Sequence, residues 1–235
     1  GPGQGPAPLA RRACGGWRRF PGRRQGRSEA RRLRGIRTLG CPRRLAAALS
    51  PAARQTAIVG RPDRALEEVE KIHATKLAFS DVLGVNLPPP PDNPDATVAG
   101  VDANKNGIRD DVELTIFKEY PDSAKTRAVL LQYALALQME VTQEFLNEEI
   151  VNAVVEENSR SGTCIADTLV PRKSPSSSRT YSDIEKIDTY TNFVDEKQFN
   201  TATRKVARDK FYEHMGSYEN SPKSPCDIDI STLTN

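Results

Sequence analysis

The sequence predicts a mostly helical fold built around a long antiparallel helical hairpin. Two segments carry this prediction, over 124–158 and over 182–216. Apolar residues recur in both at three- and four-residue spacing, which is the period of an amphipathic helix. Proline, glycine and serine are concentrated outside these segments, where they mark turns and loops. Amphipathic helices of this length must bury their apolar faces, and the simplest arrangement pairs the two.

Residues 1–62 are expected to form a disordered Arg-rich arm that precedes this fold. The first 64 residues contain 16 arginines and two acidic residues, a net charge of +14, whereas 65–235 carry a net charge of −11. Apolar residues of the arm recur at neither a helical nor a strand period. Burial could therefore not offset the conformational entropy that ordering would cost.

Three interpretations of the arm remain open. A composition rich in Arg, Ala and Ser with few acids is typical of an organelle transit peptide. The same composition suits a flexible segment that binds nucleic acid or another polyanion through its phosphates. The third interpretation is an extension that is not native to the protein. It is favoured because all basic residues up to residue 64 are arginine, whereas the remainder has 11 lysines and 7 arginines.

A helix is expected over 63–84, followed by a Pro-rich linker over 85–97. Apolar residues recur at helical spacing in the first segment, with Asp63 as a candidate N-cap and Gly84 as a stop signal. Pro88–Pro91 cannot lie inside a helix and favour an extended polyproline II conformation. The linker should therefore separate this helix from the rest of the chain.

The segment Asp102–Glu113 has the residue pattern of a calcium-binding loop. Calcium prefers six to eight oxygen ligands, and a loop of this length supplies them from positions 1, 3, 5, 7, 9 and 12. Gly107 at position 6 provides the positive φ that the sharp turn requires. The candidate ligands are the side chains of Asp102, Asn104, Asn106, Asp110 and Glu113 and the carbonyl of Ile108.

The same residues could form an Asn-Gly turn and an acidic helix start without binding a metal. Three of the candidate ligands are carboxylates, and Lys105 and Arg109 add positive charge nearby. A dissociation constant of about 10⁻⁵ to 10⁻³ M is therefore expected, which suits a constitutively filled site outside the cytoplasm. Asp111 is expected to cap the helix that follows the loop.

The motif D-x-N-x-N-G-I-x-D-x-x-E resembles the calcium repeats of thrombospondin type 3 and related bacterial surface proteins. It is EF-hand-like, but Ile108 lies at position 7, whereas an EF-hand has its buried aliphatic residue at position 8, here Arg109. The wider stretch Val98–Tyr133 also resembles a group of uncharacterised bacterial envelope or secreted proteins. This resemblance implies export to the periplasm or the medium, although the sequence shows no recognisable signal peptide.

Local signals set the expected helix ends in the calcium loop and helical domain over 98–216. A short helix should follow the loop to Glu119, and Asp122 or Ser123 should cap the next one. Residues 159–181 are expected to form a loop, and residues 217–235 a loose tail. Ser182 and Glu185 predict a capping box, and Gly216 a helix stop.

The cysteines and histidines do not have the spacing of a zinc site. Cys164 and Cys226 flank the last expected helix, and they could form a disulfide in an oxidising compartment or remain two free thiols. Glutamates along the 124–158 segment are interpreted as a solvated face, because no Glu-x-x-His motif accompanies them. They are Glu140, Glu144, Glu148 and Glu149.

These observations favour a calcium-binding, non-enzymatic structural or interaction protein that is exported. We find no Gly-rich phosphate loop and no nucleophile elbow in the sequence. We also expect no transmembrane segment, because no apolar run approaches the roughly 18 residues that would span a bilayer. The alternative is a nucleic-acid- or polyanion-binding protein that acts through the arm, if the arm is native. An unidentified protein partner would fit the leading interpretation.

Overall fold

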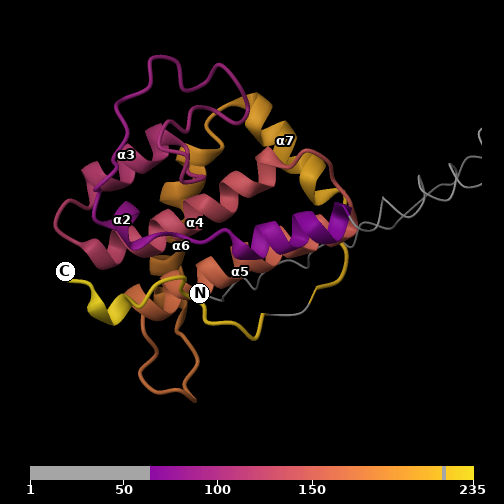
Figure 1. The fold of residues 1–235 in the computed structure, drawn as a ribbon. Coiled ribbons are helices and arrows are strands. Elements are labelled where there is room, and N and C mark those ends of the chain that lie inside the picture. The colour runs from indigo at the N-terminus through magenta and orange to yellow at the C-terminus, as the bar shows by residue number, and fades with distance from the viewer. Residues whose placement is uncertain (1–63, 219–220) are drawn as a thin grey trace, which may run out of the picture. The chain divides into compact units, whose positions relative to one another are not determined.

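The computed structural model describes residues 64–218 and 221–235 (Figure 1). Regular structure within these ranges is entirely helical, which confirms the predicted fold class. The predicted disordered arm over 1–62 and the candidate N-cap Asp63 lie outside the described residues. Among the helices described, none combines the length and the apolar character that crossing a membrane requires.

The prediction of a single helix over 63–84 is wrong at residues 75–78, which are not helical. The structure has one helix over 64–74 and a separate short helix, α2, at Phe79–Val82. The chain between them is held by the C-terminal segment, because the Leu77 N–H donates to Asp227 Oδ2 at 3.1 Å. Gly84 follows α2 with a φ of +69°, and it ends this helix as expected. The prolines that follow lie outside helices, as expected.

Helix α3 spans Asp110–Glu119 and α4 spans Ala124–Thr142. Ser123 caps α4 as expected, by accepting a hydrogen bond from the Thr126 N–H. The expected cap of α3 is wrong, because its N-cap residue is Arg109, and Asp111 lies inside the helix. The Asp111 carboxylate instead accepts two hydrogen bonds from the Arg109 guanidinium.

The long helix expected over 124–158 is divided into α4 and α5, which spans Glu148–Leu169. Asn147 caps α5 by accepting a hydrogen bond from the Ile150 N–H at 2.9 Å. The chain reverses at this point, and α5 runs back along α4 (Figure 1). The predicted loop over 159–181 is therefore helical as far as Leu169, because burial of Cys164 and its neighbours in the core favours the extended helix.

The helix expected over 182–216 is also divided, into α6 at Tyr181–Gln198 and α7 at Ala202–Tyr212. The capping box at the start of α6 consists of Thr180 and Asp183, which corrects the expected pair Ser182 and Glu185. Thr201 caps α7. The expected hairpin of two long helices is thus replaced by α5, α6 and α7, which each pack against α4.

Helix α4 lies at the centre of the hydrophobic core. Its side chains are buried on all sides, in contrast to the one-sided pattern of a surface helix. Helices α2 and α3 also pack against it. Completely buried apolar side chains of α4 meet those of α3 and α5, and they include Leu130, Leu131, Leu137, Ile116, Ile150 and Ile165.

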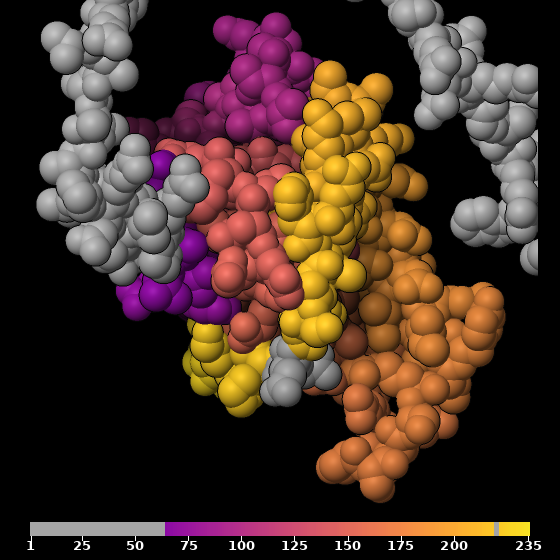
Figure 2. Space-filling model, turned by 90° about the vertical axis from the view of Figure 1, so that its right-hand side faces the viewer, coloured from indigo at the N-terminus to yellow at the C-terminus, as the bar shows by residue number. Residues whose placement is uncertain are grey.

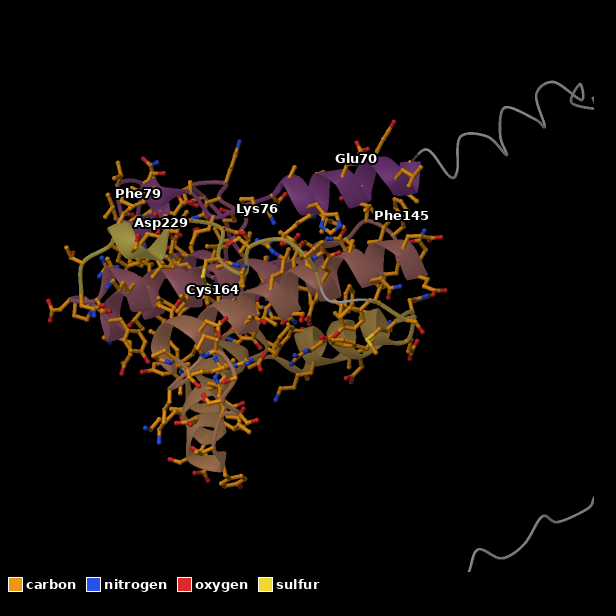
Figure 3. All side chains as sticks on the ribbon, turned by 90° about the horizontal axis from the view of Figure 1, so that it is seen from below. Glu70, Lys76, Phe79, Phe145, Cys164 and Asp229 are labelled. Atoms are coloured by element: carbon orange, nitrogen blue, oxygen red, sulfur yellow. A yellow bond between two sulfur atoms is a disulfide. The ribbon has the colours of Figure 1, made fainter. Side chains whose placement is uncertain are left out.

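The C-terminal segment is packed against the helices, so the expectation of a loose tail is wrong. A disulfide joins Cys226 to Cys164 of α5 (Figure 3), with the two Cα atoms 5.0 Å apart. Arg160 donates hydrogen bonds to the Ser224 carbonyl and to Asp227. A short 3-10 helix, η1, follows at Ile230–Thr232, and the Leu233 side chain lies in the core.

Candidate metal centre

The loop Asp102–Glu113 curls around the side-chain oxygens of its first candidate ligands. The Asp102 carboxylate accepts hydrogen bonds from the Asn106 N–H at 3.2 Å and the Gly107 N–H at 3.0 Å. The amide oxygen of Asn106 accepts one from the Ile108 N–H at 2.9 Å. The Asp102 carboxylate therefore lies on the inside of the turn, where a bound cation would be coordinated, and the Asn106 oxygen is held by the backbone of the loop.

Two residues of the loop have a positive φ. Gly107 has a φ of +83°, as the pattern predicts, and Lys105 has a φ of +59°. A Cβ atom at Gly107 would lie 2.7 Å from Leu135 Cδ1 of α4, which is closer than van der Waals contact allows. The positive φ of the turn thus favours glycine at this position, and a Cβ atom would in addition displace the end of the Leu135 side chain.

Glu113, the candidate ligand at position 12, is completely buried. Its Oε2 accepts a hydrogen bond from Asn104 Nδ2 at 3.1 Å, whereas its Oε1 has no hydrogen-bond partner. Burial raises the pKa of Glu113 to about 7, although the nearby amides of Asn104 and Asn106 lower it. A buried carboxylate oxygen without a partner costs free energy, and a cation at this position would remove that cost.

Asp110, the candidate at position 9, is less favourably oriented for a metal. It is also buried, and both of its carboxylate oxygens accept a hydrogen bond from the Ala103 N–H, at 3.0 and 3.2 Å. Burial raises its pKa, and the hydrogen bond from Ala103 opposes this effect. Coordination at position 9 through a water molecule, which is common in such loops, is compatible with this orientation.

The carboxylates by themselves do not form a metal site. Across the described ranges, no group of three or more His, Cys, Asp or Glu side chains is placed to hold a metal ion. A calcium ligand set in this loop would also include the amide oxygens of Asn104 and Asn106 and the carbonyl of Ile108. Such neutral oxygens are ordinary calcium ligands, so the donor types in the loop fit a hard cation.

Arg109 connects the loop to the end of α6. The sequence indicates positive charge near the ligands at this position, but the side chain is completely buried and bound elsewhere. Its guanidinium donates to the Lys197 carbonyl at 2.7 Å, to the Gln198 carbonyl at 2.9 Å and to the Asp111 carboxylate. Cations are favoured at helix C-termini, so this contact stabilises the position of the loop on α6.

One contact of the loop, to Asn86, has no pattern in the sequence that would predict it. Asn104 Nδ2, besides its bond to Glu113, donates to the Asn86 carbonyl at 3.0 Å. The same amide therefore connects a candidate ligand to the segment that precedes the prolines. The Ile108 side chain, by contrast, lies in the core, so this residue could contribute only its backbone to a metal.

A buried polar cluster lies between α4, α5, α6 and α7, and we call it the Glu140 cluster. It corrects the interpretation of Glu140 as part of a solvated face, because its side chain is completely buried. Glu140 accepts hydrogen bonds from Tyr212 Oη at 2.9 Å and from Asn158 Nδ2 at 2.6 Å. Arg208 lies 3.1 Å from Glu140 and 3.5 Å from Asp195, so two carboxylates share one cation. No local pattern in the sequence indicates the burial of Glu140, because it results from the packing of α5 and α7 against α4.

Replacing Glu140 by glutamine should change the pH dependence of stability. Burial raises the pKa of Glu140, and Arg208, Tyr212 and Asn158 oppose the rise. A carboxyl with a raised folded-state pKa stabilises the fold in acid and loses that contribution as the pH rises above its ordinary value of 4.5. The wild type should therefore lose stability relative to Glu140→Gln as the pH rises above 4.5.

Urea unfolding of both proteins at several pH values between about 4 and 8 checks this prediction. Glu185→Gln, at an exposed position of α6, is the control, and its stability should follow that of the wild type at every pH. Parallel pH profiles for Glu140→Gln and the wild type would contradict the prediction.

Comparison with protein-family models, curated proteins and solved structures finds no match to this chain.

Proposed function

We propose that the loop Asp102–Glu113 binds one calcium ion, and that the protein is an exported, non-enzymatic structural or interaction protein. The observation that carries the proposal is the buried Glu113 carboxylate, whose Oε1 has no hydrogen-bond partner. Asp102, Asn104, Asn106 and the Ile108 carbonyl would complete the ligand set, with Asp110 binding directly or through a water molecule.

The burial of the loop supports a structural role for the ion. Arg109 attaches the loop to the end of α6, Gly107 contacts α4, and Asn104 attaches it to Asn86. An ion bound here would fix the segment before α3 relative to the helices. Calcium at ten times its dissociation constant would stabilise the folded state by about 1.4 kcal/mol.

Calorimetric titration of the full chain with calcium tests the proposal. Saturable binding with a dissociation constant of about 10⁻⁵ to 10⁻³ M is expected. Asp102→Ala and Glu113→Gln should each abolish it, because each removes one of the three carboxylates of the candidate ligand set. Asp122→Ala is the matched control, since it removes an exposed carboxylate outside the loop.

Thermal unfolding with and without calcium distinguishes a metal site from a capped turn. The melting temperature of the wild type and of Asp122→Ala should rise with calcium, and that of the two ligand variants should not. If millimolar calcium neither releases heat nor raises the wild-type melting temperature, the loop is a metal-free turn and the proposal fails.

A further inference from the structure

Four consecutive prolines, Pro88–Pro91, impose one backbone conformation on the segment after α2. Each proline ring holds its φ near about −65°, and a residue that precedes a proline is restricted to extended ψ values. Both restrictions act on Pro88, Pro89 and Pro90. Their peptide bonds are trans and they lie outside helices. Covalent geometry thus makes this segment a polyproline II helix.

The three residues per turn of a polyproline II helix sort the segment into faces. Pro88 is buried and Pro91, one turn later, is half-buried, so this face lies against the protein. Pro89 and Pro90 are exposed, and Leu87 is 40% exposed although its side chain is large and apolar. Leu87 and Pro90 share one outward face, Pro89 lies on the other, and the exposed Asp92 follows the prolines at a bend of the chain. The segment therefore presents an apolar ridge that is followed by a carboxylate.

Buried arginines hold the chain on both sides of the ridge. Arg127 Nε donates to the Val82 carbonyl at 3.2 Å before it, and Arg204 donates to the Pro94 carbonyl at 2.7 Å after it. Figures 1 and 2 show this part of the chain, in purple to magenta, projecting from the helices near α7. A segment that is already ordered loses little conformational entropy when it binds a partner.

The chemistry of the segment selects the kind of partner. Prolines have no backbone N–H, so the ridge cannot pair with a sheet edge as an added strand. It can instead bind as a polyproline II helix, in a groove whose aromatic side chains contact successive proline rings. Asp92 favours a groove with basic residues at its rim. Leu83 and Val85, at 50% and 69% exposure, add apolar surface before the ridge.

We propose that Leu87–Asp92 is a docking segment for a protein domain whose groove is lined by aromatic side chains and carries basic residues at its rim. Aromatic-lined grooves that take proline segments occur in EVH1, SH3 and WW domains. The segment's own geometry carries this proposal, so it does not depend on calcium binding by the neighbouring loop.

Titration of the ¹⁵N-labelled full chain with purified EVH1, SH3 and WW domains tests the proposal. At least one domain should shift the amide signals of Leu87, Asp92 and Asn93 in a saturable manner. The double variant Pro89→Ala/Pro90→Ala should weaken that binding by at least about tenfold, or about 1.4 kcal/mol. Asp92→Asn should weaken it less and should remove part of its salt dependence.

Pro175→Ala, at an exposed proline between α5 and α6, is the matched control and should bind as the wild type does. The melting temperature of each variant shows whether it is folded. The proposal is overturned if none of the three domains shifts these signals at millimolar concentration, or if a folded Pro89→Ala/Pro90→Ala variant binds unchanged.

Discussion

Arg204→Ala is expected to lower the free energy of unfolding by about 3 to 5 kcal/mol, because it removes a completely buried side chain whose guanidinium satisfies several backbone carbonyls. Arg204 Nε donates to the Val98 carbonyl at 3.0 Å, and Nη2 donates to the Thr97 carbonyl at 3.1 Å. The other acceptors are the Pro94 carbonyl and the side chains of Asp95 and Asn200.

The reason for the large effect is that the arginine has no equivalent substitute. Its five N–H donors form a planar fork, and each makes one of these hydrogen bonds. Alanine would leave the carbonyls without partners and open a cavity between α7 and the segment before the calcium loop. Arg204→Lys should recover only part of the loss, because an ammonium group has three donors and no planar fork.

Urea unfolding measures the change, and a fall in melting temperature of roughly 10 °C should accompany it. Hydrogen exchange should accelerate most in the amides of residues 95–101, where the lost contacts lie. Lys205→Ala is the control at the neighbouring exposed position of α7. A loss below about 1 kcal/mol for Arg204→Ala would mean that these hydrogen bonds contribute little to stability.

Removing the disulfide between Cys164 and Cys226 should cost about 4 kcal/mol of stability. The two cysteines are 62 residues apart, and the loss of chain entropy in the unfolded state increases with the length of the closed loop. The bond also holds the C-terminal segment near Arg160, which contacts both Ser224 and Asp227. Without the disulfide, the hydrogen bond from the Leu77 N–H to the Asp227 carboxylate should also weaken, since Asp227 adjoins Cys226.

The measurement is urea unfolding of Cys164→Ser/Cys226→Ser beside the wild type, with and without a dithiol reductant. The reductant should lower the stability of the wild type to that of the variant and leave the variant unchanged. Cys14→Ser/Cys41→Ser, which removes the other two cysteines, controls for exchange with them. A wild type that is equally stable with and without reductant would contradict the prediction.

The sequence by itself determined the helical class and several local features. Ser123, Gly84 and Gly107 lie where the pattern predicts a cap, a stop and a sharp turn. These signals can be recognised because a cap or a turn depends on the conformation of only a few neighbouring residues. The candidate ligands of the calcium loop were recognisable for the same reason, since their order along the chain defines the motif.

The places where helices break were decided by tertiary structure. Apolar residues keep helical spacing through 143–147, so the periodicity across the turn between α4 and α5 gives no sign of a break. The chain reverses there because α5 can then bury its apolar face on α4. Asn147 supplies the cap, but an asparagine inside a helical pattern does not by itself predict a break.

Burial of polar groups was likewise decided by distant parts of the chain. Glu140 is a charged residue in the sequence, and its partners Asn158, Arg208 and Tyr212 come from two other helices, α5 and α7. Glu113 becomes a buried carboxylate only where α3 packs into the core. Caps and turns are local in sequence, whereas burial depends on which segments meet, and spacing along one chain does not contain that information.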